Sequence, residues 1–232
     1  MINFLKSQPA PECLALEKGK KSGDYKCGDV LTRLKADFFN KCYICESKAP
    51  PTINVEHFVP HKENVELKFS WDNLFWSCGH CNNAKLARFT NLLDCTKPES
   101  SVETRLRLKM NPFPKEKIEI VACDSDPRTT ETKELLDAVY NGTTHLKTIE
   151  AANIRDEVLK EVKKFQDLLI YYFDIEPYHD KNELLEKIKG HLSDSSSFTA
   201  IKRWIIRDSA GMFEELGEYV ETKIGEGEQE KA

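Results

Sequence analysis

Four cysteines in two closely spaced pairs, a Glu-His dipeptide and the asparagines Asn73 and Asn82 occur within residues 42–85. The pairs are Cys42 with Cys45 and Cys78 with Cys81, and two residues separate the cysteines of each pair. Zn²⁺ takes four thiolates in tetrahedral geometry, and a pair with this spacing can present both sulfurs through a tight turn. The spacing therefore predicts a closed structural zinc site. Two disulfides or four scattered thiols are the alternative.

The segment between the pairs predicts a β-hairpin that carries polar side chains. Residues 53–59 alternate β-branched and polar side chains, which is typical of a strand, and Pro60 follows them. Neighbouring strand side chains point to opposite faces, so Glu56 and His57 need a local twist to reach one substrate. We expect residues 71–74 to lead into the return strand, and a short helix over residues 82–91 to pack on the hairpin.

The order Cys-x-x-Cys, Glu56-His57, Asn73, Cys-x-x-Cys and Asn82-x-x-Lys85 resembles the HNH nucleases, the ββα-metal family, in their four-cysteine zinc-bound form. The resemblance implies that His57 is the general base that activates water. It also implies that Glu56 and Asn82 are ligands of a catalytic divalent cation. The side chain of Asn73 would brace the loop and orient the histidine.

Two positions depart from the commonest pattern of that family. Many members carry aspartate where this chain has Glu56, and histidine where it has Asn82. Both replacements keep an oxygen ligand, which favours Mg²⁺ or Mn²⁺ over zinc as the catalytic cation. Side chains near these positions are candidate phosphate contacts, with ordinary solvated side chains as the alternative; they are His61, Lys62, Lys85 and Arg88.

Composition and charge fit a globular protein with two unlike halves. The chain has 232 residues, of which 40% are hydrophobic and 31% charged. Residues 1–120 carry 19 Lys and Arg against 15 Asp and Glu, whereas the remainder carries 15 against 24. The first half is therefore the one suited to phosphate, but its excess of four positive charges is modest. Because non-specific nucleic-acid affinity comes mainly from Lys and Arg contacts, we expect a partner to supply affinity or control.

The flanking sequence predicts an α+β protein: a zinc-bound ββα-metal module with flanking helices and a mostly α-helical C-terminal half. Apolar residues recur at helical spacing ahead of Cys42, and residues 105–110 and 118–121 alternate as two paired strands. The predicted organisation is a helical lead-in at 1–41, a nuclease module with its following hairpin at 42–125, a helical domain for scaffolding or partner docking at 126–224, and a flexible tail at 225–232.

No signal peptide and no membrane-spanning run are expected, which predicts a soluble, cytoplasmic protein without a membrane partner. Four further cysteines match no metal spacing and are expected to be reduced thiols: Cys13, Cys27, Cys95 and Cys123.

The layout of the whole chain is similar to the PtuB family, the HNH subunits of Septu anti-phage systems that also occur as effectors in some retron systems. The segments that carry this similarity are residues 42–46, 55–62, 71–78 and 198–205. The resemblance implies a PtuA-like ABC-type ATPase partner and a DNA-cleaving effector. No Walker A sequence occurs here, so ATP hydrolysis would belong to the partner. DNA is favoured over RNA as substrate; an RNA nuclease acting on tRNA, and a catalytically silent zinc-stabilised binding module, are the alternatives.

Overall fold

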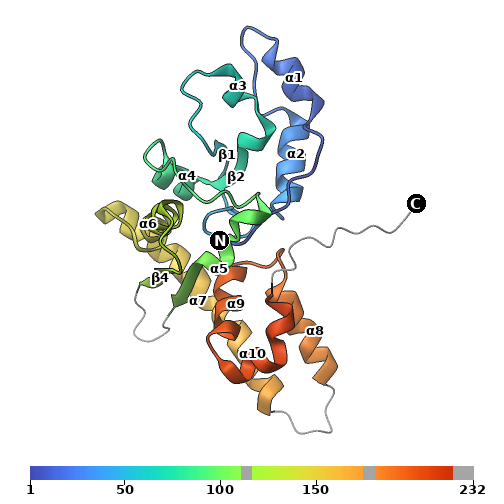
Figure 1. Cartoon of the computed structure of the whole chain (residues 1–232), viewed down its shortest axis with the longest axis vertical. Helices are drawn as coiled ribbons and strands as arrows, with labels where there is room; N and C mark the ends of the chain where they lie inside the picture. Colours follow the sequence, from blue (N-terminus) through green and yellow to red (C-terminus); the bar gives the residue numbers. More distant parts are fainter. Residues whose placement is uncertain (111–116, 175–180, 222–232) are drawn as a thin grey trace, which may run out of the picture.

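The computed structural model describes residues 1–110, 117–174 and 181–221. A mixed α+β architecture is confirmed, with a small ββα region beside the N-terminal helices and a mostly helical C-terminal half that extends away from it (Figure 1). In chain order the elements are α1 (Glu12–Lys18), α2 (Gly28–Asp37), β1 (Ile53–His57), α3 (Val65–Lys68), η1 (Trp71–Asn73), β2 (Leu74–Cys78), α4 (Gly79–Lys85), η2 (Pro98–Ser100), α5 (Val102–Arg105), β3 (Leu106–Met110), β4 (Ile118–Ala122), α6 (Pro127–Asn141), α7 (His145–Asp174), α8 (Lys181–Leu192), α9 (Thr199–Arg207), α10 (Ala210–Leu216) and η3 (Gly217–Tyr219).

Strands β1 and β2 form the predicted antiparallel hairpin, in which Ile53 pairs with Cys78 and His57 pairs with Leu74. All five residues of β2 are buried, because α2 and α4 both pack against this strand. The apolar side chains of Leu74, Phe75 and Trp76 in this strand stabilise the fold, because folding removes their surface from water. The hairpin is therefore anchored in the core through β2.

The second predicted hairpin is also confirmed, with Leu106 opposite Ala122 and Met110 opposite Ile118. The residues that join its strands fall outside the described part of the chain. Helix α6 packs on β4, and the Asn141 side chain bonds both the N–H and the carbonyl of Ile118. Helix α6 contacts α4, and β3 contacts α9, so this hairpin and α6 connect the ββα region to the C-terminal helices (Figure 1).

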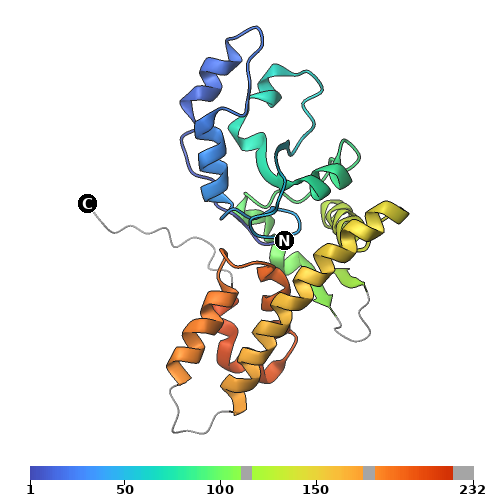
Figure 2. The same ribbon diagram turned by 180° about the vertical axis from the view of Figure 1, so that it is seen from behind.

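Helix α7, which is 30 residues long, runs from the middle of the molecule to its helical end (Figure 2). Its residues up to Val162 contribute Ile154, Val158 and Val162 to the main hydrophobic core. Its second half contributes Phe165 and Leu169 to a smaller core shared with α8, α9 and α10. The helix thus carries one face that is continuous between the two cores.

The helical half packs directly onto the first cysteine pair. The Tyr140 hydroxyl donates to the carbonyl of Cys45 at 2.9 Å, and the Ala200 N–H donates to the Glu46 carboxylate at 3.2 Å. Lys41, fully buried beside Glu46, donates to the carbonyl of Asp194. The domain boundaries given above remain a prediction, and the proposed tail at 225–232 lies outside the described residues.

Two expectations from the sequence are wrong. Cys13 and Cys27 form a disulfide instead of staying reduced, because the approach of α1 and α2 brings their Cα atoms to 6.4 Å, within the usual disulfide range. Helix α4 ends at Lys85 and not near residue 91, because Leu86 adopts a positive φ of 43°, which no α-helix can continue. Cys95 and Cys123 are free thiols, as expected.

Among the described residues, no helix is both long enough and apolar enough to cross a membrane.

Candidate active site and four-cysteine centre

The two cysteine pairs meet at the end of the hairpin where Ile53 faces Cys78. Their four sulfur atoms lie within 4.8 Å of one another and all four side chains are buried; the residues are Cys42, Cys45, Cys78 and Cys81. Four thiolates around one Zn²⁺ at about 2.3 Å would place their sulfurs about 3.8 Å apart, which this cluster approaches. The four cysteines can therefore hold a structural zinc ion.

Local structure explains how each pair presents its sulfurs. Cys78 closes β2 and is the N-cap of α4, where its sulfur accepts from the Cys81 N–H at 3.4 Å. On the other side, the Glu46 N–H donates to the carbonyl of Cys42 at 2.9 Å, which closes a tight turn. His80 lies between the second pair, and its ring contacts the Val139 carbonyl and the Glu150 carboxylate, each at 2.8 Å. The centre is thereby tied to α6 and α7.

The opposite end of the hairpin carries His57. Its Nε2 lies 3.0 Å from the carbonyl oxygen of Lys68. A carbonyl only accepts, so Nε2 carries the proton, and Nδ1 is the basic atom of the neutral ring. Partial burial lowers the pKa of His57 below its usual 6.5, against the opposing effect of the hydrogen bond to the Lys68 carbonyl, and the neighbouring His61, Lys68 and Lys85 lower it further. The ring is therefore neutral and basic at Nδ1 near neutral pH.

Two other rings hold His57 edge-on. The Tyr25 ring lies 4.5 Å from it and the His61 ring 4.6 Å from it, measured between centroids. His61 Nδ1 accepts from the Glu63 N–H at 3.1 Å, so Nε2 is the donor atom of the neutral His61 ring. Tyr25 was not identified from the sequence, because nothing in its spacing links it to a residue 32 positions later.

Asn73 immediately precedes β2 and its buried side chain joins two segments of the loop. Its Oδ1 accepts from the Val59 N–H at 2.7 Å, while its Nδ2 donates to the carbonyls of Val59 and Leu67 at 2.9 and 3.0 Å. Asn73 does not touch His57 in these contacts. It fixes the backbone at Leu67, next to the Lys68 carbonyl that holds the histidine.

Glu56 points to the other face of the strand, as the alternation of side chains dictates. It is 6% exposed and accepts from the Tyr43 hydroxyl at 3.1 Å, while Lys85 Nζ lies 2.8 Å from the same oxygen. Burial raises the pKa of Glu56 to about 7, against the opposing effect of Lys85. In this structure the Glu56 carboxylate is therefore paired with Lys85 and Tyr43.

The surroundings of the second carboxylate oxygen of Glu56, Oε2, indicate whether a divalent cation fits beside this residue. Within the described residues, Glu56 Oε2 is buried and has no hydrogen-bond partner. An unpaired carboxylate oxygen in the interior is costly unless a cation or water completes its contacts. Helix α4, which carries half-buried Asn82, packs against β1. A carboxylate oxygen and an amide oxygen are hard ligands of the kind that Mg²⁺ and Mn²⁺ accept, so these residues fit such an ion.

The remaining candidate residues fall into different surroundings. Lys62 and Arg88 are exposed, and Arg88 lies over the Phe89 ring at 5.0 Å. Lys85, in contrast, is only 1% exposed, and besides Glu56 it donates to the His57 carbonyl at 3.2 Å. In this arrangement its charge is directed to the interior of the ββα unit and not to the surface.

Residues 42–88 match the model of the HNH family, described as HNH endonuclease. A search of the curated proteins found no match. The chain therefore contains an HNH endonuclease domain with a cluster of four buried cysteines, and such a domain implies nuclease activity on a nucleic-acid substrate.

Proposed function

We propose that this protein is a metal-dependent endonuclease that hydrolyses phosphodiester bonds of DNA, with His57 as its general base. The observation that carries the proposal is the hydrogen bond from His57 Nε2–H to the Lys68 carbonyl. It leaves Nδ1 as the basic atom on a ring that burial keeps neutral. A positioned neutral imidazole is the commonest general base in enzymes.

In the proposed reaction, His57 Nδ1 takes a proton from a water molecule as the water oxygen bonds to phosphorus. The bond from phosphorus to the leaving oxygen breaks, and that oxygen is protonated from solvent. Glu56 and Asn82 would hold a divalent cation, which supplies positive charge to the phosphate oxygens during the reaction. Asn73 acts on the loop that presents the Lys68 carbonyl, and so keeps Nδ1 directed to the water.

Phosphate binding is assigned to three side chains near the hairpin, His61, Lys62 and Arg88. His61 offers its Nε2–H as a donor, because its Nδ1 is engaged by Glu63. Lys62 is exposed immediately after it. Arg88 follows α4 and is also exposed. These three contacts are few, which fits the modest positive charge of the first half of the chain.

For the biological setting, we propose that the chain is the cleaving effector of an anti-phage complex with an ABC-type ATPase of the PtuA kind. The support is the similarity of sequence layout to the PtuB family, together with the small positive excess that leaves room for a partner to supply affinity. Purification of the chain from its native host, followed by identification of the co-purifying protein, tests this. A stable complex that lacks an ATPase would argue against it.

The activity is tested by incubating the purified chain, with whatever co-purifies, with plasmid DNA and total cellular RNA in Mg²⁺ or Mn²⁺. His57→Ala serves as the control. DNA cleaved only by the wild type supports the proposal, and RNA cleaved only by the wild type replaces it with an RNA nuclease. Cleavage that persists in the His57→Ala protein overturns the assignment of the base.

A further inference from the structure

Tyr25, which lies against the His57 ring, belongs to a segment that a disulfide closes into a loop. The disulfide joins Cys13 in α1 to Cys27 at the N-cap of α2. Tyr25 lies two residues before Cys27 and is half-buried against the main core. The only covalent cross-link among the described residues therefore lies beside the residue that reaches the proposed base.

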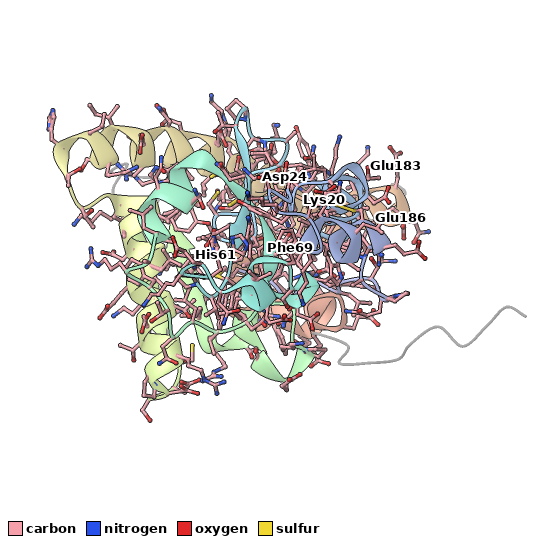
Figure 3. The ribbon with its side chains drawn as sticks, turned by 90° about the horizontal axis from the view of Figure 1, so that it is seen from above. Lys20, Asp24, His61, Phe69, Glu183 and Glu186 are labelled. Atoms are coloured by element: carbon pink, nitrogen blue, oxygen red, sulfur yellow. A yellow bond between two sulfur atoms is a disulfide. The ribbon has the colours of Figure 1, made fainter. Side chains whose placement is uncertain are left out.

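The closed loop is also fixed by close contacts to its surroundings. Gly23 carries no side chain at a place where a Cβ would lie 1.8 Å from the carbonyl oxygen of Glu17. Its own carbonyl accepts from Lys68 Nζ at 3.4 Å, and the Asp24 N–H donates to the Glu17 carboxylate at 3.0 Å. A Cβ at Gly23 would also lie 3.2 Å from the ring of Phe69, the residue that follows α3; Figure 3 labels Phe69 and the loop residue Asp24. The loop is thus folded onto both α1 and α3.

One hydrogen bond cannot fix the orientation of an imidazole. The contact between His57 Nε2 and the Lys68 carbonyl holds one atom of the ring, and the Cβ holds the other end. The ring can still tilt about the line between these points, and this tilt carries Nδ1 with it. A neighbouring ring in edge contact, such as Tyr25 at 4.5 Å, limits the tilt.

We infer that Tyr25 is a positioning residue for His57. The Cys13–Cys27 disulfide supports this role indirectly, by holding Tyr25 in place. The inference rests on the proposed function, in which His57 Nδ1 receives the proton of the attacking water. Because the contact is between rings, the aromatic ring of Tyr25 carries the effect and its hydroxyl does not.

The first test compares Tyr25→Ala and Tyr25→Phe in steady-state cleavage of the substrate found for the wild type. Misplacement of a reacting group by a fraction of an ångström reduces the rate, so Tyr25→Ala should lower kcat about tenfold or more, with KM little changed. Tyr25→Phe keeps the ring and should restore most of the lost kcat. A Tyr25→Ala protein with wild-type kcat, or a Tyr25→Phe protein as slow as Tyr25→Ala, would overturn the inference.

The second test separates the disulfide from general stability. The double variant Cys13→Ser/Cys27→Ser should lower kcat, whereas Cys123→Ser, which removes an exposed free thiol, should not. If the disulfide acts through Tyr25, adding Tyr25→Ala to the double variant should lower kcat no further than Tyr25→Ala alone does. Fully additive losses in kcat would contradict this coupling.

A readout that needs no cleavage keeps this inference distinct from the proposed function. Diethyl pyrocarbonate acylates accessible imidazole nitrogens, and mass spectrometry measures the rate at each histidine. Loss of the Tyr25 ring should raise the rate at His57 severalfold in Tyr25→Ala and not in Tyr25→Phe, relative to exposed His145 in the same sample. An unchanged rate at His57 would sink the positioning role, even for a protein that cleaves nothing.

Discussion

The two ends of the hairpin β1–β2 are built in opposite ways. At the Ile53–Cys78 end, four buried sulfur atoms converge within 4.8 Å and helices of the C-terminal half cover them. At the His57–Leu74 end, a half-buried histidine is held by one hydrogen bond and two ring contacts. A site for structural metal must be closed, whereas a site for chemistry must leave one atom of its base accessible. One short hairpin satisfies both requirements because the two sites lie at its opposite ends.

The hydrogen bonds of Glu56 and Asn73 differ in which end of the hairpin they reach. The Glu56 side chain is directed to Tyr43, between the cysteines of the first pair, although Glu56 is adjacent to His57 in sequence. Asn73 joins the exit of β1 to the residue before Lys68. A substitution in the four-cysteine cluster should therefore also reduce activity at the His57 end. A substitution at the His57 end should leave the cysteine cluster folded. The following predictions test this asymmetry.

The largest effect is expected at the closed end. Cys78→Ser should abolish zinc binding by the cluster and unfold the ββα region, because structural zinc sites contribute several kcal/mol or more of folding free energy. Metal analysis and circular dichroism melting measure this, and Cys123→Ser, which alters an exposed free thiol, is the matched control. A zinc-free Cys78→Ser protein with wild-type melting and activity would contradict the four-cysteine assignment.

His57→Ala should remove activity and spare the fold. Loss of a general base typically costs a factor of about 10² to 10⁴ in rate, whereas loss of the single hydrogen bond to Lys68 costs about 1 kcal/mol of stability. Cleavage rates and zinc content measured on one preparation check both halves of the prediction. His145→Ala, at an exposed position, is the control. Loss of zinc from the His57→Ala protein would show that the two ends are not independent.

Asn73→Ala should affect the active end by an intermediate amount. Removal of the side chain leaves the part-buried Val59 N–H and Leu67 carbonyl without their partner, at a cost of about 1 kcal/mol in the free energy of unfolding. The rate should fall as well, because the Lys68 carbonyl loses its neighbouring support. Denaturant unfolding and cleavage assays measure both, with exposed Asn91→Ala as control. A destabilised variant of undiminished kcat would limit Asn73 to a structural role.

The smallest expected effect concerns pH. Because the pKa of His57 is lowered, its neutral form persists below pH 6.5, and kcat/KM should decline only at more acid pH. Lys68→Met keeps the carbonyl and removes a positive charge that lowers this pKa, so the acid limb should move to higher pH. The leading causes of the raised pKa of Glu56 are its own burial and the opposing charge of Lys85, so Lys68→Met should act mainly on His57. A rate that is constant from about pH 5 to 9 would exclude a titrating base.

Most of the fold near the site could be predicted from the sequence, because local rules govern it. The alternation around Glu56 predicted β1, and the alternation in residues 105–110 and 118–121 predicted the hairpin β3–β4. The end of α4 was missed, because a single residue with positive φ leaves no signal in the apolar pattern. The disulfide was missed because pairing of Cys13 with Cys27 depends on how two helices approach each other.

The sequence by itself determined which residues could do chemistry: cysteine pairs with the spacing for zinc, the Glu56-His57 dipeptide, and Asn73 and Asn82 after it. Only the tertiary structure decided how they are used. It directed Glu56 to Lys85, gave His57 a defined basic nitrogen through the Lys68 carbonyl, and brought Tyr25 from a distant loop. The physical reason is that metal spacing and strand alternation are properties of neighbouring residues, whereas protonation and orientation depend on which groups pack around a side chain.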